Sequence, residues 1–408
     1  MKYKRILLCI LFLAAYTAGA EPEPKRGFAV HEWGVFRVNT DAEYANAELR
    51  VEWDELPPFV YGHIKGRTVP QSWGAVEIRK RPIVFFHTDK PVIAKVHIDF
   101  PGGEAGAWYP ATSVPSIIRF DKEPKTGQVL EWNLGIKNPP QGWAPGHNGL
   151  RDVPDKHWIQ RIRQVSSDPI YARFGPRFND VDFEKFLYYD GIFPQKNWVK
   201  IKIEAEKITL KNLCQHTLFD VTIVDRRGEP LRIAHVPEFK ADASLNIDKW
   251  TKQEEATVVK ESVARLQEQL VAAGLYQDEA DSMIDLWRTD FFMTPGLSLF
   301  YRLPQKEYDR CLPLTITPKP DSLVRVGLIH QAHLEPEFKD KIIQLIIQLD
   351  AKRFAERVEA RKQLLRCGPA ALAIINTYRK TNKISAEVEN QLADLIKKWS
   401  SKDAFDRD

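Results

Sequence analysis

The stretch HEWGVF, residues 31–36, decides how the N-terminal half of the chain is interpreted. Its β-branched and aromatic residues favour an extended strand over a helix. Alternation along a strand sends His31 and Trp33 to one face and Glu32 to the other. Because the imidazole and the carboxylate then point apart, a catalytic His31–Glu32 pair is disfavoured. We predict a core strand with Trp33 as its buried anchor. The functional alternative places His31 at a pocket rim, and His31 and Trp33 are both candidate binding residues.

Sequence signatures of common enzyme classes are missing from the chain. A zinc metalloprotease helix needs a second histidine four residues after the first, but position 35 is valine. The GxSxG, P-loop, GxGxxG and CxxC patterns do not occur either. The sequence therefore gives no direct sign of catalysis.

The first twenty residues have the three parts of a secretory signal. Basic residues at positions 2, 4 and 5 precede an apolar run, Ile6 to Ala15, and small residues follow at 18–20. The apolar run is too short to span a bilayer, so we expect cleavage after Ala20 and a secreted or periplasmic protein. The alternative is an uncleaved anchor. No later stretch is apolar enough to cross a membrane, so we expect no transmembrane segment after signal cleavage.

Charge and cysteine content narrow the class of protein further. The 59 Lys and Arg residues nearly balance the 55 Asp and Glu residues, and three of the basic residues belong to the signal. We therefore expect no nucleic-acid partner, which would require a concentrated basic face. Cys214, Cys311 and Cys367 are an odd number without close spacing. Either one bridge, such as Cys214 to Cys311, or three small buried thiols fits this pattern.

Residues 21–335 read as a β-rich body of Ig-like or sandwich strands. Arg81 to Phe100 is expected to be a hairpin around the turn-forming residues 88–91. In its second arm, alternation turns Lys95, His97 and Asp99 to solvent. The opposite, buried set is Val92, Ala94, Val96, Ile98 and Phe100.

Further strands and an inserted pair of helices complete the predicted body. Helical periodicity over 251–292 indicates two helices, the first ended by Gly274 and the second begun by Asp278 and Glu279. β-rich runs on either side of this insertion suggest that the sheet resumes after it. These runs are 199–203, 208–210, 218–224, 231–236, 297–303, 312–316 and 323–330.

A Pro- and Gly-rich stretch, residues 122–149, is expected to be a long loop. Trp143 lies in it between Gly142 and Ala144, and we expect its ring to be exposed. Exposed rings stack on sugars or anchor protein partners, so Trp143 is a candidate binding residue.

Residues 336–408 are expected to form a helical tail. A Leu-Asp lead-in at 349–350, F-A-x-R-x-x-A at Phe354 to Ala360 and a Gly-Pro-Ala-Ala turn at 368–371 precede a closing amphipathic helix. These features resemble a HEAT-like helical unit, which implies a packing or partner-binding role rather than catalysis. Only one such unit is present, so we do not expect a solenoid.

Histidines give two further candidate sites. His97 and Asp99 share a strand face and are the candidate metal ligands, with His87 and Asp89 forming a similar pair. A metal ion needs three or four converging ligands, so a residue distant in the sequence, such as His63 or His147, would have to complete the site. His330 and His333, where the body meets the tail, are candidate binding residues or ordinary hydrogen-bonded joint residues.

Four motifs together resemble a group of uncharacterised exported bacterial proteins with an N-terminal HEWG. They are HEWG at His31 to Gly34, an E-K-F-L-x-Y block from Glu184, E-A-x-x-M-x-x-x-W-R at Glu279 to Arg288, and L-P-L-x-I-x-P-x-P at Leu312 to Pro320. The resemblance implies the order of the fold and transfers no catalytic residue.

The combined expectation is an α+β protein: a β-sandwich-rich body with an inserted helical hairpin and a C-terminal HEAT-like segment. For its function we expect an exported binding or scaffold protein of the cell envelope, without a cofactor, whose partner is a protein or an envelope glycan. The alternative is a metal-assisted hydrolase acting on envelope glycan or peptide, with a divalent metal. Convergence of any three of the histidines would favour the metal.

Overall fold

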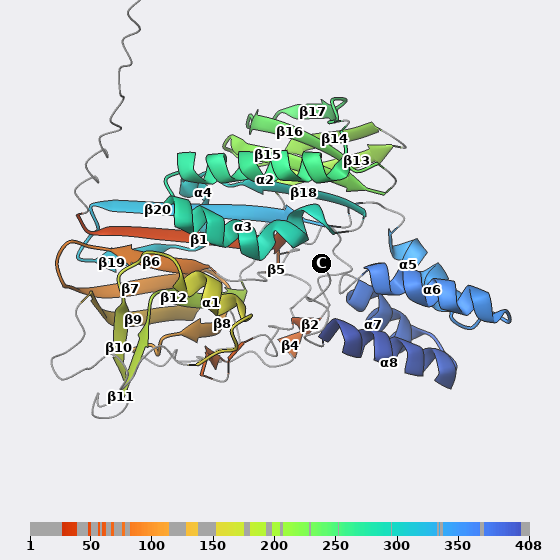
Figure 1. Ribbon diagram of the computed structural model, residues 1–408, viewed down its shortest axis with the longest axis horizontal. Helices are drawn as coiled ribbons and strands as arrows, with labels where there is room; N and C mark the ends of the chain where they lie inside the picture. Colours follow the sequence, from red (N-terminus) through yellow and green to blue (C-terminus); the bar gives the residue numbers. More distant parts are fainter. Residues whose placement is uncertain are drawn as a thin grey trace, which may run out of the picture.

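A computed structural model describes a β-rich body and a helical tail (Figure 1). The described residues are 27–38, 48–49, 56–57, 59–62, 67–68, 76–77, 82–113, 128–137, 152–174, 180–192, 198–204, 207–227, 230–251, 253–294, 296–332, 334, 338–367 and 371–400. The predicted α+β class is confirmed. The predicted signal, residues 1–20, lies outside the described residues.

A ten-stranded sheet forms the centre of the body. Its strands, in spatial order, are β16 (Arg232–Phe239), β15 (Leu218–Arg226), β18 (Gly296–Arg302), β20 (Ser322–Gln331), β1 (Ala29–Val38), β6 (Ile83–His87), β12 (Leu187–Ile192), β8 (Glu104–Tyr109) and β3 (Tyr61–Gly62). A short strand, β5 (Val76–Glu77), also pairs with β1. β1 runs antiparallel to β6 but parallel to β20, so this sheet joins the two ends of the body.

Smaller sheets accompany the large one. A five-stranded sheet contains β11 (Asp180–Glu184), β10 (Ile170–Phe174), β9 (Gln128–Ile136), β7 (Val92–Phe100) and β19 (Leu314–Thr317). A three-stranded sheet contains β13 (Val199–Glu204), β14 (Lys207–Asn212) and β17 (Ser244–Ile247), and a pair joins β2 (Glu48–Leu49) to β4 (Arg67–Thr68).

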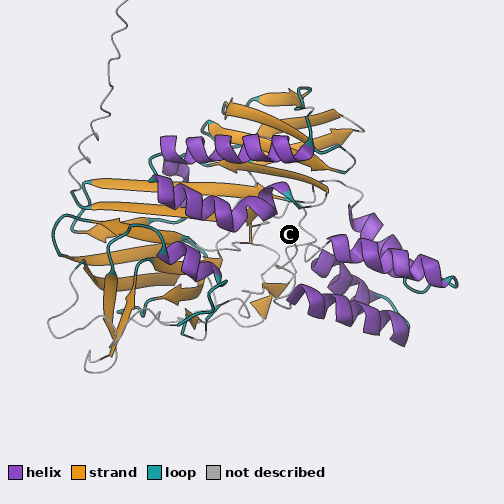
Figure 2. Ribbon diagram, viewed as in Figure 1, coloured by secondary structure: helices purple, strands orange, loops and turns teal. Residues whose placement is uncertain are grey.

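The large sheet is buried on both faces. On one face it shares a core with the five- and three-stranded sheets, as in a sandwich, and this core includes Val30, Phe86 and Trp132. On the other face it packs against α1 (Trp158–Arg163), α2 (Glu255–Ala272) and α3 (Gln277–Phe292) (Figure 2). Alternate residues of one central strand therefore enter different cores.

The predicted hairpin over residues 81–100 is wrong in its pairing. Its two arms are the strands β6 and β7, but β6 pairs with β1 and β12 whereas β7 pairs with β9 and β19. The chain therefore passes from one sheet to the other between these strands. All five residues of β6 are buried, as expected for a central strand covered on both sides. The predicted alternation of β7 is confirmed, with Ala94, Val96, Ile98 and Phe100 buried.

The stretch predicted to be a long loop contains a strand. Residues 128–136 form β9 in the middle of the five-stranded sheet, where Trp132 is buried. Most of the prolines and glycines that suggested a loop come after this strand, in residues 138–149, although Pro124 and Gly127 precede it and Gly135 lies within it. The segment 138–149, with Trp143, lies outside the described residues.

The inserted helical hairpin is confirmed. α2 is followed by Gly274 at φ +108°, a left-handed conformation that suits glycine. The sheet then resumes as predicted, because β18 and β20 join the ten-stranded sheet and β19 joins the five-stranded sheet. A short helix, α4 (Gln305–Cys311), connects β18 to β19.

The tail comprises α5 (Phe338–Gln348), α6 (Phe354–Cys367), α7 (Leu372–Thr381) and α8 (Ala386–Ser400). It has its own core, which includes Ile342, Leu364 and Leu392 and no residue of the body among those described. Figure 1 shows the four helices as a group beside the sheets. In the part of the chain that the structure describes, no helix has both the length and the apolar character needed to cross a membrane.

The structure distinguishes between a disulfide bridge and three buried thiols. Cys214, Cys311 and Cys367 are free and buried, so the proposed bridge is not formed. Burial raises the pKa of the Cys311 thiol to about 12.

Candidate metal centre

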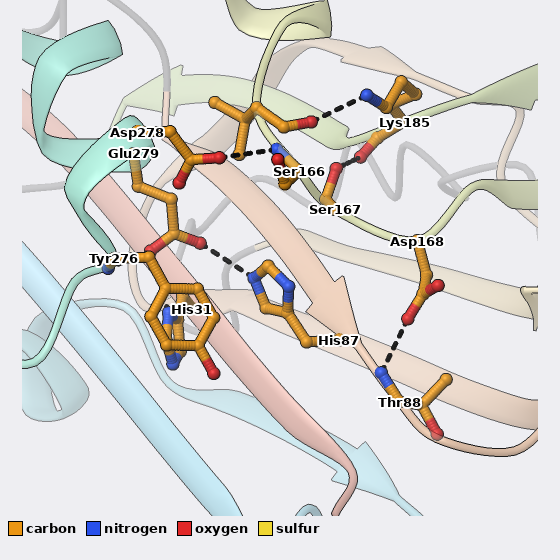
Figure 3. A network of polar contacts seen from close by, with 11 residues as sticks. His31, His87, Thr88, Ser166, Ser167, Asp168, Lys185, Tyr276, Asp278 and Glu279 are labelled. Atoms are coloured by element: carbon orange, nitrogen blue, oxygen red, sulfur yellow. Dashed lines mark hydrogen bonds and ion pairs between the residues drawn. The ribbon is translucent and has the colours of Figure 1, made fainter. Parts of the chain in front are cut away.

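Three buried side chains from distant parts of the chain meet between the large sheet and α3 (Figure 3). His31 belongs to β1, His87 is the last residue of β6, and Glu279 lies in the first turn of α3. Within the described ranges, this is the one group of at least three His, Cys, Asp or Glu residues whose ligand atoms all lie within 4.8 Å of one another. We refer to these three residues as the His–Glu–His cluster.

The strand register explains why the two imidazoles meet. β1 and β6 are antiparallel, with Ala29 opposite His87 and His31 opposite Phe85. The two histidines therefore project from the same face on neighbouring strands, and their ring centroids are 5.1 Å apart. Trp33 and Phe85, which lie on the same faces as the two histidines, are buried in the core between the large sheet and helices α1, α2 and α3, which we call the helix-side core. The predicted alternation of β1 is confirmed, and the face that carries His31 is covered by α3.

Glu279 bridges the two histidines. One carboxylate oxygen, Oε2, lies 2.8 Å from Nδ1 of His31 and accepts a 2.8 Å hydrogen bond from the backbone N–H of Tyr276. The other, Oε1, lies 2.9 Å from Nε2 of His87. Burial by itself raises the pKa of Glu279, but the hydrogen bonds from the two histidines outweigh it, and the net pKa is lowered. The carboxylate is thus held ionised although it is fully buried.

The hydrogen bonds define which imidazole nitrogens carry protons. An ionised carboxylate only accepts, so His31 donates from Nδ1 and His87 donates from Nε2. Nδ1 of His87 is buried and has no hydrogen-bond partner among the described residues. A divalent cation could take the place of the two donated protons, because it would bind the same nitrogens and the same carboxylate.

The segment between α1 and β10 closes one side of the cluster (Figure 3). The N–H of Ser166 donates to Oδ2 of Asp278 at 2.7 Å, next to Glu279 on α3. The N–H of Thr88, next to His87, donates to Oδ2 of Asp168 at 2.7 Å. These bonds fix the segment to α3 and to the end of β6, two of the three elements that carry the cluster. In this enclosed site His31 is 3% exposed, His87 is 1% exposed and Glu279 is 0% exposed.

Glu32 belongs to a different buried network on the opposite face of β1. Its Oε2 accepts from Nε of Arg325 at 2.5 Å, and its Oε1 accepts from the hydroxyls of Tyr189 and Tyr308. Arg325 also donates to Asp309 at 2.8 Å and lies 4.2 Å from the centroid of the Tyr308 ring. Burial, and then the Glu32 charge, raise the pKa of both tyrosines well above the usual range. The two halves of the His31–Glu32 dipeptide thus belong to separate polar groups.

The structure places His97 and Asp99 on the outer face of β7. The imidazole lies between two carboxylates, with Nε2 3.1 Å from Asp99 and Nδ1 3.4 Å from Glu131. Lys95 pairs with the same Glu131 at 2.9 Å. Because the imidazole uses opposite nitrogens for the two acids, one ion could not bind all three groups through these atoms. This arrangement is a partly exposed ion-pair network.

The remaining candidate residues are dispersed. Trp33 is fully buried in the helix-side core, as predicted for the anchor. His330 is buried in β20, and its ring makes an edge contact with Phe291 at a centroid distance of 5.4 Å. Trp143 and His333, together with His63 and His147 as possible extra ligands, lie outside the described residues.

Sequence reasoning identified His31 but missed its partners. His87 was paired with Asp89, which is exposed, and Glu279 was interpreted as an acid that suits the start of a helix and as the first residue of the E-A-x-x-M-x-x-x-W-R motif. In the structure Glu279 lies three positions after the N-cap of α3 and is completely buried. Its burial could not be foreseen without knowing which strand ends lie opposite α3.

Comparison with known proteins found no relative of this chain. Neither the protein-family models nor the curated proteins contain a match to this chain.

Proposed function

We propose that the protein is an exported binding protein whose body holds a divalent transition-metal ion in the His–Glu–His cluster. The observation that carries the proposal is that His31, His87 and Glu279 each offer a ligand atom, and that these three atoms lie within 4.8 Å of one another. Export is inferred from the signal-like residues 1–20.

The ligand set argues for zinc or a related ion. Two imidazoles and one carboxylate suit Zn²⁺ and other first-row transition metals, whereas Mg²⁺ and Ca²⁺ prefer oxygen ligands only. Glu279 is already ionised, so it contributes a negative charge without a further proton loss. The two imidazoles contribute lone pairs from the nitrogens that face Glu279 once these nitrogens no longer carry protons.

Burial favours a structural role for the ion over hydrolysis. An ion here would connect β1, β6 and α3, three elements far apart in the sequence. A catalytic zinc needs a coordination position that substrate can reach, but the three ligand residues are at most 3% exposed. The adjacent acid Glu32 is engaged by Arg325 on the opposite face, so it supplies no general base here. The metal-assisted hydrolase remains the second candidate.

The helical tail supports the binding role. It packs around its own core, and it exposes the large apolar side chains Ile347, Phe354 and Val358. Exposed apolar groups of this size are typical of contact surfaces. We propose that the tail contacts the protein or envelope-glycan partner while the body supplies a rigid base.

Metal binding is tested on the purified mature chain after removal of metal by chelator. Titration with Zn²⁺, followed by calorimetry and elemental analysis, should give one ion per chain and a raised Tm. His31→Ala, His87→Ala and Glu279→Gln should each weaken binding beyond the ~10–100-fold that is typical for loss of an outer-shell partner. His97→Ala is the matched control and should bind normally. Equal binding by all variants, or none by the wild type, would refute the proposed site.

The tail's role is tested by partner capture from envelope extracts. The full mature chain should retain partners that a chain without residues 337–408 loses, and Phe354→Ala with Val358→Ala should lose them in part. Partners retained by the truncated chain would contradict this role. Release of fragments from envelope glycan or peptide by the zinc-loaded protein would instead support the hydrolase.

A further inference from the structure

Tyr276 lies directly over the His–Glu–His cluster. Its ring centroid is 4.5 Å from that of His31 and 4.7 Å from that of His87, and its backbone N–H donates to Glu279. This single residue therefore contacts all three members of the cluster. Figure 3 shows the ring against His31, with its hydroxyl directed away from the Glu279 carboxylate. The phenol oxygen is thus not placed as a further ligand.

Exposed or partly exposed residues lie next to the buried cluster at this end of the sheet. His87 is the last residue of β6, and two positions later Asp89 is exposed. Glu279 lies in the first turn of α3, whose N-cap is Tyr276. The three ligand residues are almost wholly buried, whereas Tyr276 is half-buried. Its ring accordingly lies between the cluster and solvent on this side.

The backbone around Tyr276 gives the ring a defined position. Leu275 is buried in the helix-side core, and Gly274, at φ +108°, provides the sharp turn out of α2. The turn that follows α2 thus delivers Tyr276 onto the two imidazoles. The opposite side of the cluster is closed by the segment that carries Ser166 and Asp168, which is bonded to α3 and to the end of β6.

We propose that Tyr276 covers the metal centre and sets the rate at which the ion enters and leaves. This inference rests on the proposed metal site. The ring offers no donor atom to the ion, so its removal speeds entry and release together and changes the equilibrium affinity less than the rates. Loss of two aromatic contacts of this kind changes a rate or equilibrium constant by about tenfold or more. Tyr276 acts as a positioning residue because it contacts the ligands rather than the ion.

The test measures zinc release from the loaded, full mature chain into an excess of a chromogenic chelator by stopped flow. Tyr276→Ala should release zinc at least about tenfold faster than the wild type, on the scale set by those two ring contacts. Tyr276→Phe keeps the ring and should release zinc at the wild-type rate. Ile93→Ala, which removes an exposed apolar side chain from β7, is the control and should also match the wild type.

Each outcome bears on a different claim. If both the wild type and Tyr276→Ala bind zinc and release it equally fast, Tyr276 does not cover the site. The proposed metal site would still stand. Acceleration by Tyr276→Phe equal to that by Tyr276→Ala would also overturn the proposed cover, because the hydroxyl would then be the controlling group. Failure of the wild type to bind zinc would overturn both proposals. If Tyr276→Ala does not fold, Tyr276→Leu replaces it with the same expected acceleration.

Discussion

Replacing the bridging carboxylate with an amide should destabilise the metal-free protein by about 2–3 kcal/mol. Glu279 accepts bonds from His31, His87 and the Tyr276 N–H. Glu279→Gln keeps the shape of the side chain but replaces the charged acceptor with a neutral amide. Each hydrogen bond to an imidazole then becomes weaker by about 1 kcal/mol. Loss of a negative charge at the start of α3 adds about 0.5 kcal/mol.

The measurement is denaturant unfolding in the presence of chelator, followed by tryptophan fluorescence. This signal reports on the body, because every tryptophan except Trp399 precedes the tail. Asp278→Asn is the matched control: it removes the neighbouring first-turn charge but keeps an oxygen for the Ser166 N–H. We expect it to cost no more than about 1 kcal/mol. Equal losses for the two variants would refute the view that the cluster is a stabilising buried network.

The pH dependence provides an independent check of the same reasoning. The pKa of Glu279 is lowered from 4.5 in the folded protein, mainly because the histidine hydrogen bonds outweigh its burial. A lowered folded pKa means that this stabilisation is fully present above pH 4.5 and is lost as the pH falls through the folded pKa. The advantage of the wild type over Glu279→Gln should therefore shrink in acid. An advantage that grows in acid would contradict the assignment of an ionised carboxylate.

Three further predictions concern other parts of the molecule. Arg325→Ala should cost about 3–5 kcal/mol in thermal or denaturant unfolding, because it leaves the buried Glu32 carboxylate without its cation; a loss below about 1 kcal/mol would contradict this. Cys311, with a pKa of about 12, should resist alkylation at pH 8 in the native protein and react only after unfolding, as read by peptide mass spectrometry. Removal of residues 337–408 should leave the Tm of the body within about 2–4 °C of its value in the full chain, since the core of the tail shares no described residue with either core of the body; a body that fails to fold would show that the tail is required.

The local sequence pattern was sufficient to predict which side chains share a face within one strand or helix. Period two in HEWGVF correctly separated His31 from Glu32, and period two in β7 correctly placed His97 and Asp99 on the outer face. Helical periodicity located α2, α3 and the tail, and Gly274 marked the end of α2. These features depend on neighbours within a few residues, which a sequence displays directly.

Pairing between distant strands depended on the tertiary structure. A strand's alternation shows which side chains share a face, but it does not name the partner strand. For this reason β6 and β7 looked like a hairpin although they belong to different sheets, and β9 was hidden in a Pro- and Gly-rich stretch. The parallel pairing of β1 with β20 connects residues that are almost 300 positions apart, beyond any local pattern.

The sequence by itself determined the α+β class, the order of body, helical insertion and tail, and the face of β1 on which His31 lies. Only the tertiary structure decided that His87 and Glu279 meet His31, because that requires the β1–β6 register and the docking of α3 onto the sheet. Ligand convergence is a property of three-dimensional distance, and here it joins residues 31, 87 and 279, which no spacing motif relates.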